Sequence, residues 1–152
     1  MKLTEERKTA QNTTRRHFLT TVATAALCGC TGSSGPAAFG DVSAGNAKDI
    51  AVGSLAVVGS EPVMLGRDSG GLYAMTITCT HQGCDVEPSG SGSSVRVRCP
   101  CHGSEFNSNG AVTRGPAGSP LAHFAVDIDA SGAVTIHGGK QVGATVRTPV
   151  PA

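Results

Sequence analysis

The sequence predicts an all-β, mainly antiparallel fold for the main part of the chain, residues 49–138. From residue 63 onward, short segments alternate apolar and polar side chains, which is the period of a half-buried strand. Clusters of Gly, Asp, Asn and Ser separate these segments in the way that tight turns do. No segment after residue 29 shows apolar residues at the helical period. Strands and turns are therefore expected to build the domain.

The first 29 residues are expected to be an export signal. Residues 1–17 are polar and basic, residues 18–27 are apolar, and small residues follow, which is the layout of a secretory signal. The basic part contains Arg15-Arg16 and resembles the twin-arginine export motif, which implies export across a bacterial membrane to the periplasmic side. The alternative is a chance Arg-Arg pair ahead of an apolar run.

A second resemblance follows the apolar run. Leu27-Cys28-Gly29-Cys30 is similar to a lipobox, which would leave a lipid anchor on Cys30 after cleavage behind Gly29. The apolar run is shorter than the ~20 residues that span a bilayer, so no permanent transmembrane anchor is expected. Ordinary cleavage and an uncleaved signal anchor stay open. Residues 30–48 are rich in Gly, Ser and Ala and are expected to form a flexible tether.

The strands of the domain are predicted in order. Residues 63–67 and 72–78 flank Asp68-Ser69-Gly70-Gly71, which reads as a hairpin turn. Residues 95–99 alternate apolar and charged side chains after a flexible loop at 89–94. Further strands are expected at 111–114, 124–129 and 133–137, and a loose C-terminal tail at 139–152.

Two short motifs begin where two predicted strands end. They are Cys79-Thr80-His81-Gln82-Gly83-Cys84 and Cys99-Pro100-Cys101-His102-Gly103-Ser104. Thiolate and imidazole ligands favour iron or zinc, and Asp85 is the carboxylate beside the loops. One interpretation is a structural zinc site built from Cys79, His81, Cys99 and His102. The other is a [2Fe-2S] centre in which two histidines replace two cysteines on one iron. Zinc leaves Cys84 and Cys101 without a role.

Together the motifs resemble those of the Rieske [2Fe-2S] family, over about residues 50–138. The resemblance implies one [2Fe-2S] cluster, with Cys79 and Cys99 on the buried iron and His81 and His102 on the outer iron. It also implies a disulfide between Cys84 and Cys101. The implied fold is an antiparallel one in which a cluster-binding subdomain packs on a base sheet.

The resemblance assigns further residues around the cluster. Ser104 stands where a hydroxyl bonds a bridging sulfide, and Phe106 where the highest-potential members carry a tyrosine. Residues 115–120 begin with Gly115-Pro116 and resemble the proline-rich loop that covers the cluster; a stiff surface turn is the alternative. Outside the motifs, His123 and His137 are expected at the surface or at an edge rather than as ligands. Glu105, beside the second motif, is expected to be a solvated charge rather than an acid catalyst.

Composition limits the other possibilities. The chain has 152 residues with 21 glycines, no Trp and one Tyr, so we expect one small domain stapled by a disulfide and a metal cluster. The net charge is +1, and the sequence has no basic run interleaved with aromatic residues. This composition gives no case for nucleic acid binding.

A cluster without an open coordination site moves one electron. The sequence therefore favours an exported one-electron carrier, or a small electron-transfer subunit, with no catalytic site of its own. Its partner would be a c-type cytochrome or a larger oxidoreductase subunit. The alternative is the quinol-oxidising Rieske subunit of a cytochrome bc-type complex, from whose pattern Gln82 departs. A ring-hydroxylating oxygenase would need a large catalytic domain, for which no chain length remains.

Overall fold

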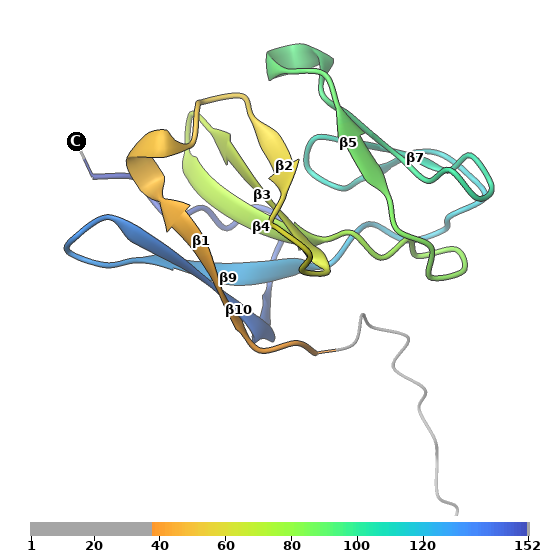
Figure 1. Ribbon diagram of the computed structural model, residues 1–152. Coiled ribbons are helices and arrows are strands. Elements are labelled where there is room, and N and C mark those ends of the chain that lie inside the picture. The colour runs from red at the N-terminus through yellow and green to blue at the C-terminus, as the bar shows by residue number, and fades with distance from the viewer. Residues whose placement is uncertain (1–37, 152) are drawn as a thin grey trace, which may run out of the picture. The chain divides into compact units, whose positions relative to one another are not determined.

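A computed structural model describes residues 38–151, which build ten strands and two short 3-10 turns (Figure 1). The export motif with Arg15 and Arg16, the candidate lipid site Cys30 and most of the expected tether lie outside the described residues. No helix found between residues 38 and 151 is long and apolar enough to cross a membrane. The all-β, antiparallel prediction is confirmed for this part of the chain.

The larger sheet has six strands in the order β1-β10-β9-β4-β3-β2, and every neighbouring pair is antiparallel. Its strands are β1 Asp41–Asn46, β2 Leu55–Val57, β3 Val63–Asp68, β4 Gly71–Thr76, β9 His123–Ile128 and β10 Ala133–Val142. A 3-10 turn, η1 Ala47–Asp49, follows β1. We call this six-stranded sheet the base sheet.

The smaller sheet has four strands in the order β5-β6-β7-β8, again antiparallel throughout. Its elements are β5 Glu87–Ser89, η2 Gly92–Ser94, β6 Arg96–Arg98, β7 Glu105–Asn107 and β8 Val112–Arg114. This sheet comes from the segment between β4 and β9, so it is an insertion into the base sheet's chain order. The predicted arrangement of a subdomain inserted into a base sheet is present.

Strand β4 is buried on both of its faces. Successive side chains of a strand point to opposite faces. Tyr73 and Met75 belong to an apolar core that also contains residues of the two cysteine motifs. Leu72 and Ala74 belong to a second core between β1, β3, β9 and β10. The strand that leads into the first motif is therefore held by two apolar cores.

The sequence analysis did not predict four strands: β1, and the three-residue strands β2, β5 and β7. β5 contains Pro88 between two exposed residues, so alternation is not visible in its sequence. The predicted hairpin of β3 and β4 and the predicted strands β6, β8 and β9 are present within one or two residues of their expected bounds.

The expected tether at 30–48 is wrong for its last part. Asp41–Asn46 is strand β1 and pairs with β10. The Phe39 ring packs edge-on against Phe124, with 4.8 Å between ring centroids, and Val42 is buried. The sequence analysis did not predict this strand, because composition alone predicts a linker for a segment that contains Gly and Ala.

The expected loose tail from residue 139 is also wrong. β10 continues to Val142, five residues past its predicted end. The Leu72 and Thr148 backbones then exchange two hydrogen bonds, each of 2.9 Å. His123, expected at the surface, is instead buried at 3% exposure, with 6.3 Å between its ring centroid and that of Tyr73.

Candidate metal centre

The first motif folds into a tight loop directly after β4. The Cys79 amide donates to the Cys84 carbonyl at 2.8 Å, and the Gly83 amide donates back to the Cys79 carbonyl at 2.9 Å. Gly83 has φ +77°, in the left-handed region that favours glycine. A bridge between Thr78 and Asp85 closes the base of the loop. We call residues 79–84 the first cluster loop.

The second motif repeats this geometry after β6. The Cys99 amide donates to the Ser104 carbonyl at 2.8 Å, and the Gly103 amide donates to the Cys99 carbonyl at 3.0 Å. Gly103 has φ +74°. Residues 99–104, the second cluster loop, thus have the same bonding pattern as the first. This equivalence explains why Gly stands at the fifth position of both motifs.

The two loops bring the four candidate ligands to one region. Cys79 and Cys99 are free thiols, exposed by only 2% and 1%. The rings of His81 and His102 lie edge to face with 4.9 Å between centroids. His102 is exposed, whereas His81 is half-buried. Thiols inside and imidazoles outside are the division that the sequence analysis expected.

One buried histidine nitrogen of the cluster loops lacks a hydrogen-bond partner within residues 38–151. His81 Nδ1 is buried and has no hydrogen-bond partner among the described residues. A buried polar atom without a partner is costly, so a ligand at this position is the economical explanation. Two buried thiols beside two imidazoles, one of them with an orphaned nitrogen, fit a metal centre with sulfur and nitrogen ligands.

Burial raises the pKa of the Cys79 thiol, and the adjacent Cys99 thiol adds to this shift. The His81 backbone N–H and the Ser104 hydroxyl oppose it. Two thiolates side by side in such a place need positive charge to compensate them. A metal ion bound by the thiolates would supply that charge.

The disulfide predicted between Cys84 and Cys101 is present, with 6.5 Å between the Cα atoms. It ties the end of the first cluster loop to the middle of the second. The Cys99 sulfur lies within 4.8 Å of both disulfide sulfurs. Since Cys84 and Cys101 are bonded to each other, Cys99 is the sulfur of this group that remains free to bind a metal.

The predicted neighbours of the cluster lie at different depths. Ser104 and Phe106 are completely buried, Phe106 on β7 opposite Val97 of β6. Gly115 and Pro116 are exposed, but the next residue, Ala117, is buried. The Ala117 amide donates to Ser104 Oγ at 2.9 Å, so residues 115–120, the proline-rich loop, are bonded to the second cluster loop.

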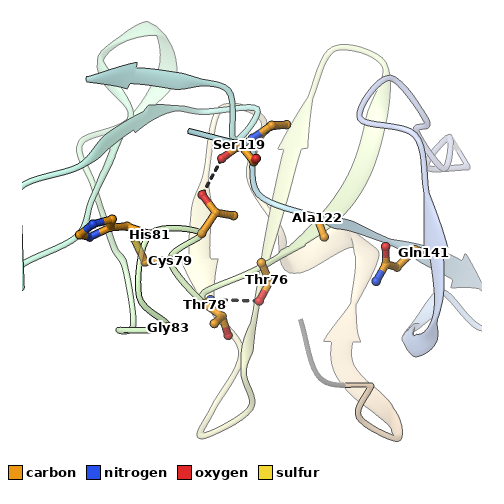
Figure 2. Close-up of a pocket in the computed structure, with 10 residues that line it drawn as sticks. Thr76, Thr78, Cys79, His81, Gly83, Ser119, Ala122 and Gln141 are labelled. Atoms are coloured by element: carbon orange, nitrogen blue, oxygen red, sulfur yellow. Dashed lines mark hydrogen bonds between the residues drawn. The ribbon is translucent and has the colours of Figure 1, made fainter. Parts of the chain in front are cut away.

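A cavity of about 460 Å³ opens beside the first cluster loop (Figure 2). Cys79 and His81 form part of its wall, with Thr76 and Thr78 below and Ser119, Ala122 and Gln141 across from them. The Thr80 hydroxyl donates to the Ser119 carbonyl at its rim, at 2.6 Å. The cavity therefore borders the first cluster loop on this side.

Two charged or titratable residues outside the motifs, Glu105 and His137, have protein partners. His137 lies on β10 between Asp41 and Asp127, and Glu105 faces Arg114 at 3.5 Å. Sequence reasoning missed Thr80 and Arg147, whose partners lie 38 to 79 residues away in the chain. No local pattern marks such residues, because their roles depend on tertiary contacts.

The comparisons with known proteins agree with this site. Residues 40–125 match the Rieske [2Fe-2S] domain family. The cytochrome b6-f complex iron-sulfur subunit of Prochlorococcus marinus strain MIT 9303 is 48% identical over 69 residues, which is 44% of this chain and 38% of that protein. The subunit of the same name from Synechococcus sp. strain CC9605 is 43% identical over 67 residues, or 44% of this chain and 36% of that protein. The chain thus spans less than two fifths of these relatives' length.

A solved structure shares the fold. It is a chain from the complex of reduced oxygenase and oxidised ferredoxin in carbazole 1,9a-dioxygenase, with a TM-score of 0.50 and 29% identity. The match covers 68% of this chain and 97% of that one. The family match also decides between zinc and iron, since it includes both cluster loops. The chain belongs to the Rieske [2Fe-2S] domain family, and its cofactor is a [2Fe-2S] cluster.

Proposed function

We propose that this Rieske protein is an exported one-electron carrier, or the small electron-transfer subunit of a larger oxidoreductase. When bound, the [2Fe-2S] cluster supplies a one-electron couple. The observation that carries the proposal is the division of the ligands, with Cys79 and Cys99 buried and the edge-to-face pair of His81 and His102 at or near the surface. The exposed imidazole of His102 gives a docked protein a short path to the cluster.

The chain's own residues keep this centre in an electron-transfer role. Cys79, Cys99, His81 and His102 would fill the ligand positions. The Cys84–Cys101 disulfide ties the two loops, and the proline-rich loop covers Ser104. We assign no acid, base or nucleophile to this site, because its conspicuous polar groups are candidate ligands or are bonded within the fold.

The proposed partner is a c-type cytochrome or a larger oxidoreductase subunit. The chain of similar fold comes from a complex of an oxygenase and a ferredoxin, which supports a role between two redox proteins. The cluster of this chain would accept one electron from its donor and pass it to its acceptor through the histidine surface.

The second candidate is the quinol-oxidising Rieske subunit of a cytochrome bc-type complex. The observation that favours it is the name of the relatives, which are iron-sulfur subunits of the cytochrome b6-f complex. Gln82 in the first cluster loop and the phenyl ring of Phe106 depart from the pattern expected of that role.

Two measurements separate these functions. The dithionite-reduced, desalted holoprotein is mixed with an oxidised c-type cytochrome in a stopped-flow instrument, and we expect rapid bleaching of the reduced cluster with matching haem reduction. In parallel, the tagged full chain is purified from detergent-treated membranes of its source. Co-purification of stoichiometric b-type haem with quinol-dependent cluster reduction would overturn the carrier proposal in favour of the second candidate.

The proposed location is the periplasmic side of the membrane, with a lipid on Cys30. The support is the sequence alone, through Arg15-Arg16 and the lipobox-like segment. The Arg15→Lys, Arg16→Lys double variant is expected to accumulate as cytoplasmic precursor, and Cys30→Ala to leave the membrane fraction after export. Normal export of the double Lys variant, measured by fractionation and immunoblot, contradicts the twin-arginine assignment.

A further inference from the structure

The turn between β7 and β8 belongs to the cluster-binding sheet but is bonded to the base sheet. This turn comprises residues 107–110. The Tyr73 hydroxyl, from β4, donates to the Ser108 carbonyl at 2.9 Å, and the Leu121 amide donates to the Gly110 carbonyl at 2.9 Å. Tyr73 is buried at 6% exposure. The turn is therefore a junction between the two sheets.

The guanidinium of Arg147 lies over this junction. It donates from Nη2 to Asn109 Oδ1 at 2.7 Å and from Nε to Asp68 Oδ2 at 2.6 Å. Its central carbon lies 4.2 Å from the centroid of the Tyr73 ring, a cation-π distance. One side chain thus joins three segments: the β3–β4 turn, the β7–β8 turn and the C-terminal segment.

Arg147 is itself held in this geometry. Its Nη1 donates to the carbonyls of Ala144 and Val146 at 2.9 and 2.8 Å, and only 16% of its side chain is exposed. Burial alone would raise the pKa of the Asp68 carboxyl, but the Arg147 hydrogen bond and charge, with the Gly70 amide, hold it below its usual range. The carboxylate is thus charged at neutral pH and pairs with a fixed cation.

The position of the β7–β8 turn bears on the cluster because the hairpin is short. β7 begins directly after Ser104, the last residue of the second cluster loop, and β8 ends directly before Gly115, the first residue of the proline-rich loop. Each strand has three residues. A shift of the turn therefore moves both loops, which meet at the bond from Ala117 to Ser104.

We propose that Arg147 is a positioning residue that locks the β7–β8 hairpin to the base sheet and so keeps the second cluster loop and the proline-rich loop closed over the cluster. The inference rests on the cluster and on the fold, not on the identity of the redox partner. It assigns a role to the C-terminal segment, which lies outside the part of the chain that matches the family.

The test uses the holoprotein and the variant Arg147→Gln, which keeps polar character and loses both the charge and the fork of donors. The variant loses the charged hydrogen bonds that hold the β7–β8 turn, so the two loops should open more often. Bleaching of the cluster by a chelator should then be roughly tenfold faster. Amide exchange should accelerate at Gly110, Ala117 and Leu121, and stay unchanged at Val42 and Ile136 in the base sheet. Arg147→Lys keeps the charge and should therefore lie between wild type and Arg147→Gln in bleaching and in amide exchange.

Arg114→Gln is the matched control. Arg114 forms a 3.5 Å pair with Glu105 at the other end of the same hairpin and is exposed, so its loss should leave bleaching, exchange and reduction potential unchanged. The reduction potential should shift in Arg147→Gln alone, because displaced Ser104 alters the hydrogen bonding around the cluster. A merely stabilising arginine would not move the potential.

Two results would overturn the proposal. One is a folded Arg147→Gln variant whose amide-exchange and bleaching rates equal those of wild type. The other is an exchange rate that rises as much in the base sheet as in the β7–β8 hairpin, which would mean that Arg147 stabilises the whole domain. If Arg147→Gln does not fold, Asn109→Ala removes the hydrogen bond from Arg147 to the turn. This variant should show the same local pattern of exchange. Failure of electron transfer to a cytochrome would sink the proposed carrier function and leave these readouts untouched.

Discussion

The Thr80 hydroxyl donates a 2.6 Å hydrogen bond to the Ser119 carbonyl, which joins the first cluster loop to the proline-rich loop. The second cluster loop reaches the same segment through Ser104, whose Oγ accepts from the Ala117 amide. The proline-rich loop is therefore fastened to both cluster loops, at two positions two residues apart. Each fastening can be removed by a single substitution.

Thr80→Val removes the hydroxyl and keeps the shape of the side chain. A neutral hydrogen bond contributes ~0.5–1.5 kcal/mol, so the cluster should be released to a chelator roughly three- to tenfold faster. Thr80→Ser keeps the hydroxyl and should behave as wild type. Bleaching of the visible absorption under excess chelator measures both variants, and equal rates for Val and Ser would show that the bond does not control closure.

Phe106→Tyr should raise the reduction potential. The ring is completely buried on β7, and the family resemblance puts a new hydroxyl there within reach of a ligating sulfur. A hydrogen bond to that sulfur favours the more negative, reduced cluster by about 1 kcal/mol. For a one-electron couple this corresponds to roughly 40 mV.

Ser104→Ala should lower the potential by a similar amount. It should also weaken the protein, since the buried Ala117 amide loses its acceptor. Protein-film voltammetry on wild type and both variants measures the two shifts. Identical potentials for wild type and an intact Phe106→Tyr cluster would mean that residue 106 does not tune the centre.

The Cys84→Ala, Cys101→Ala double variant should lose its cluster at lower temperature. The disulfide links residues 17 apart in sequence, and removing such a bridge from a small exported domain typically costs ~2–5 kcal/mol. The remaining cysteines still supply two thiolates, so the EPR signal of the bound cluster should keep its type. Thermal bleaching measures the effect, and an unaltered bleaching curve contradicts it.

His137 should make the base sheet more stable at lower pH. Its Nε2 faces Asp127 at 2.9 Å and its Nδ1 faces Asp41 at 3.0 Å, and these hydrogen bonds raise the pKa of His137 above 6.5. The stabilisation is full below the unfolded value of 6.5 and is lost as pH rises through the raised folded value. Both ring nitrogens can donate only when the imidazole is protonated.

The difference in melting temperature between wild type and His137→Gln isolates this effect. It should be largest at acid pH and vanish above the folded pKa. Buried His123 works in the opposite sense, because burial lowers its pKa and costs stability as pH falls below 6.5, but it is present in both proteins and cancels. A difference that stays constant with pH would contradict the charged bridge.

The cluster loops could be predicted because their chemistry is local. Cysteine, histidine and glycine stand at fixed offsets, and each loop closes through its own backbone hydrogen bonds. In the first loop, one of these runs from the Cys79 amide to the Cys84 carbonyl. The hairpin of β3 and β4 was predictable for the same reason. Its turn contains Gly71, with φ +133°, and a Cβ at this position would clash with the Thr148 carbonyl oxygen.

The edges of the domain could not be predicted, because their structure depends on distant partners. β1 consists largely of small and polar residues and becomes a strand only against β10. His123 was expected at the surface from its place in a strand pattern, but it is buried beside the ring of Tyr73, which lies 50 residues earlier in the chain. Arg147 gave no local signal at all, since Asp68 and Asn109 lie 79 and 38 residues away.

The pairing of β1 with β10 has a consequence for biosynthesis. The first strand of the described fold has its sheet partner in β10, which follows every other described strand in the chain. During synthesis from the N-terminus, β1 must wait without a partner until β10 is available. Both cluster loops are made before that moment, on a base sheet that still lacks β9 and β10. A chain of this topology completes its metal centre's support only after β10 has been made.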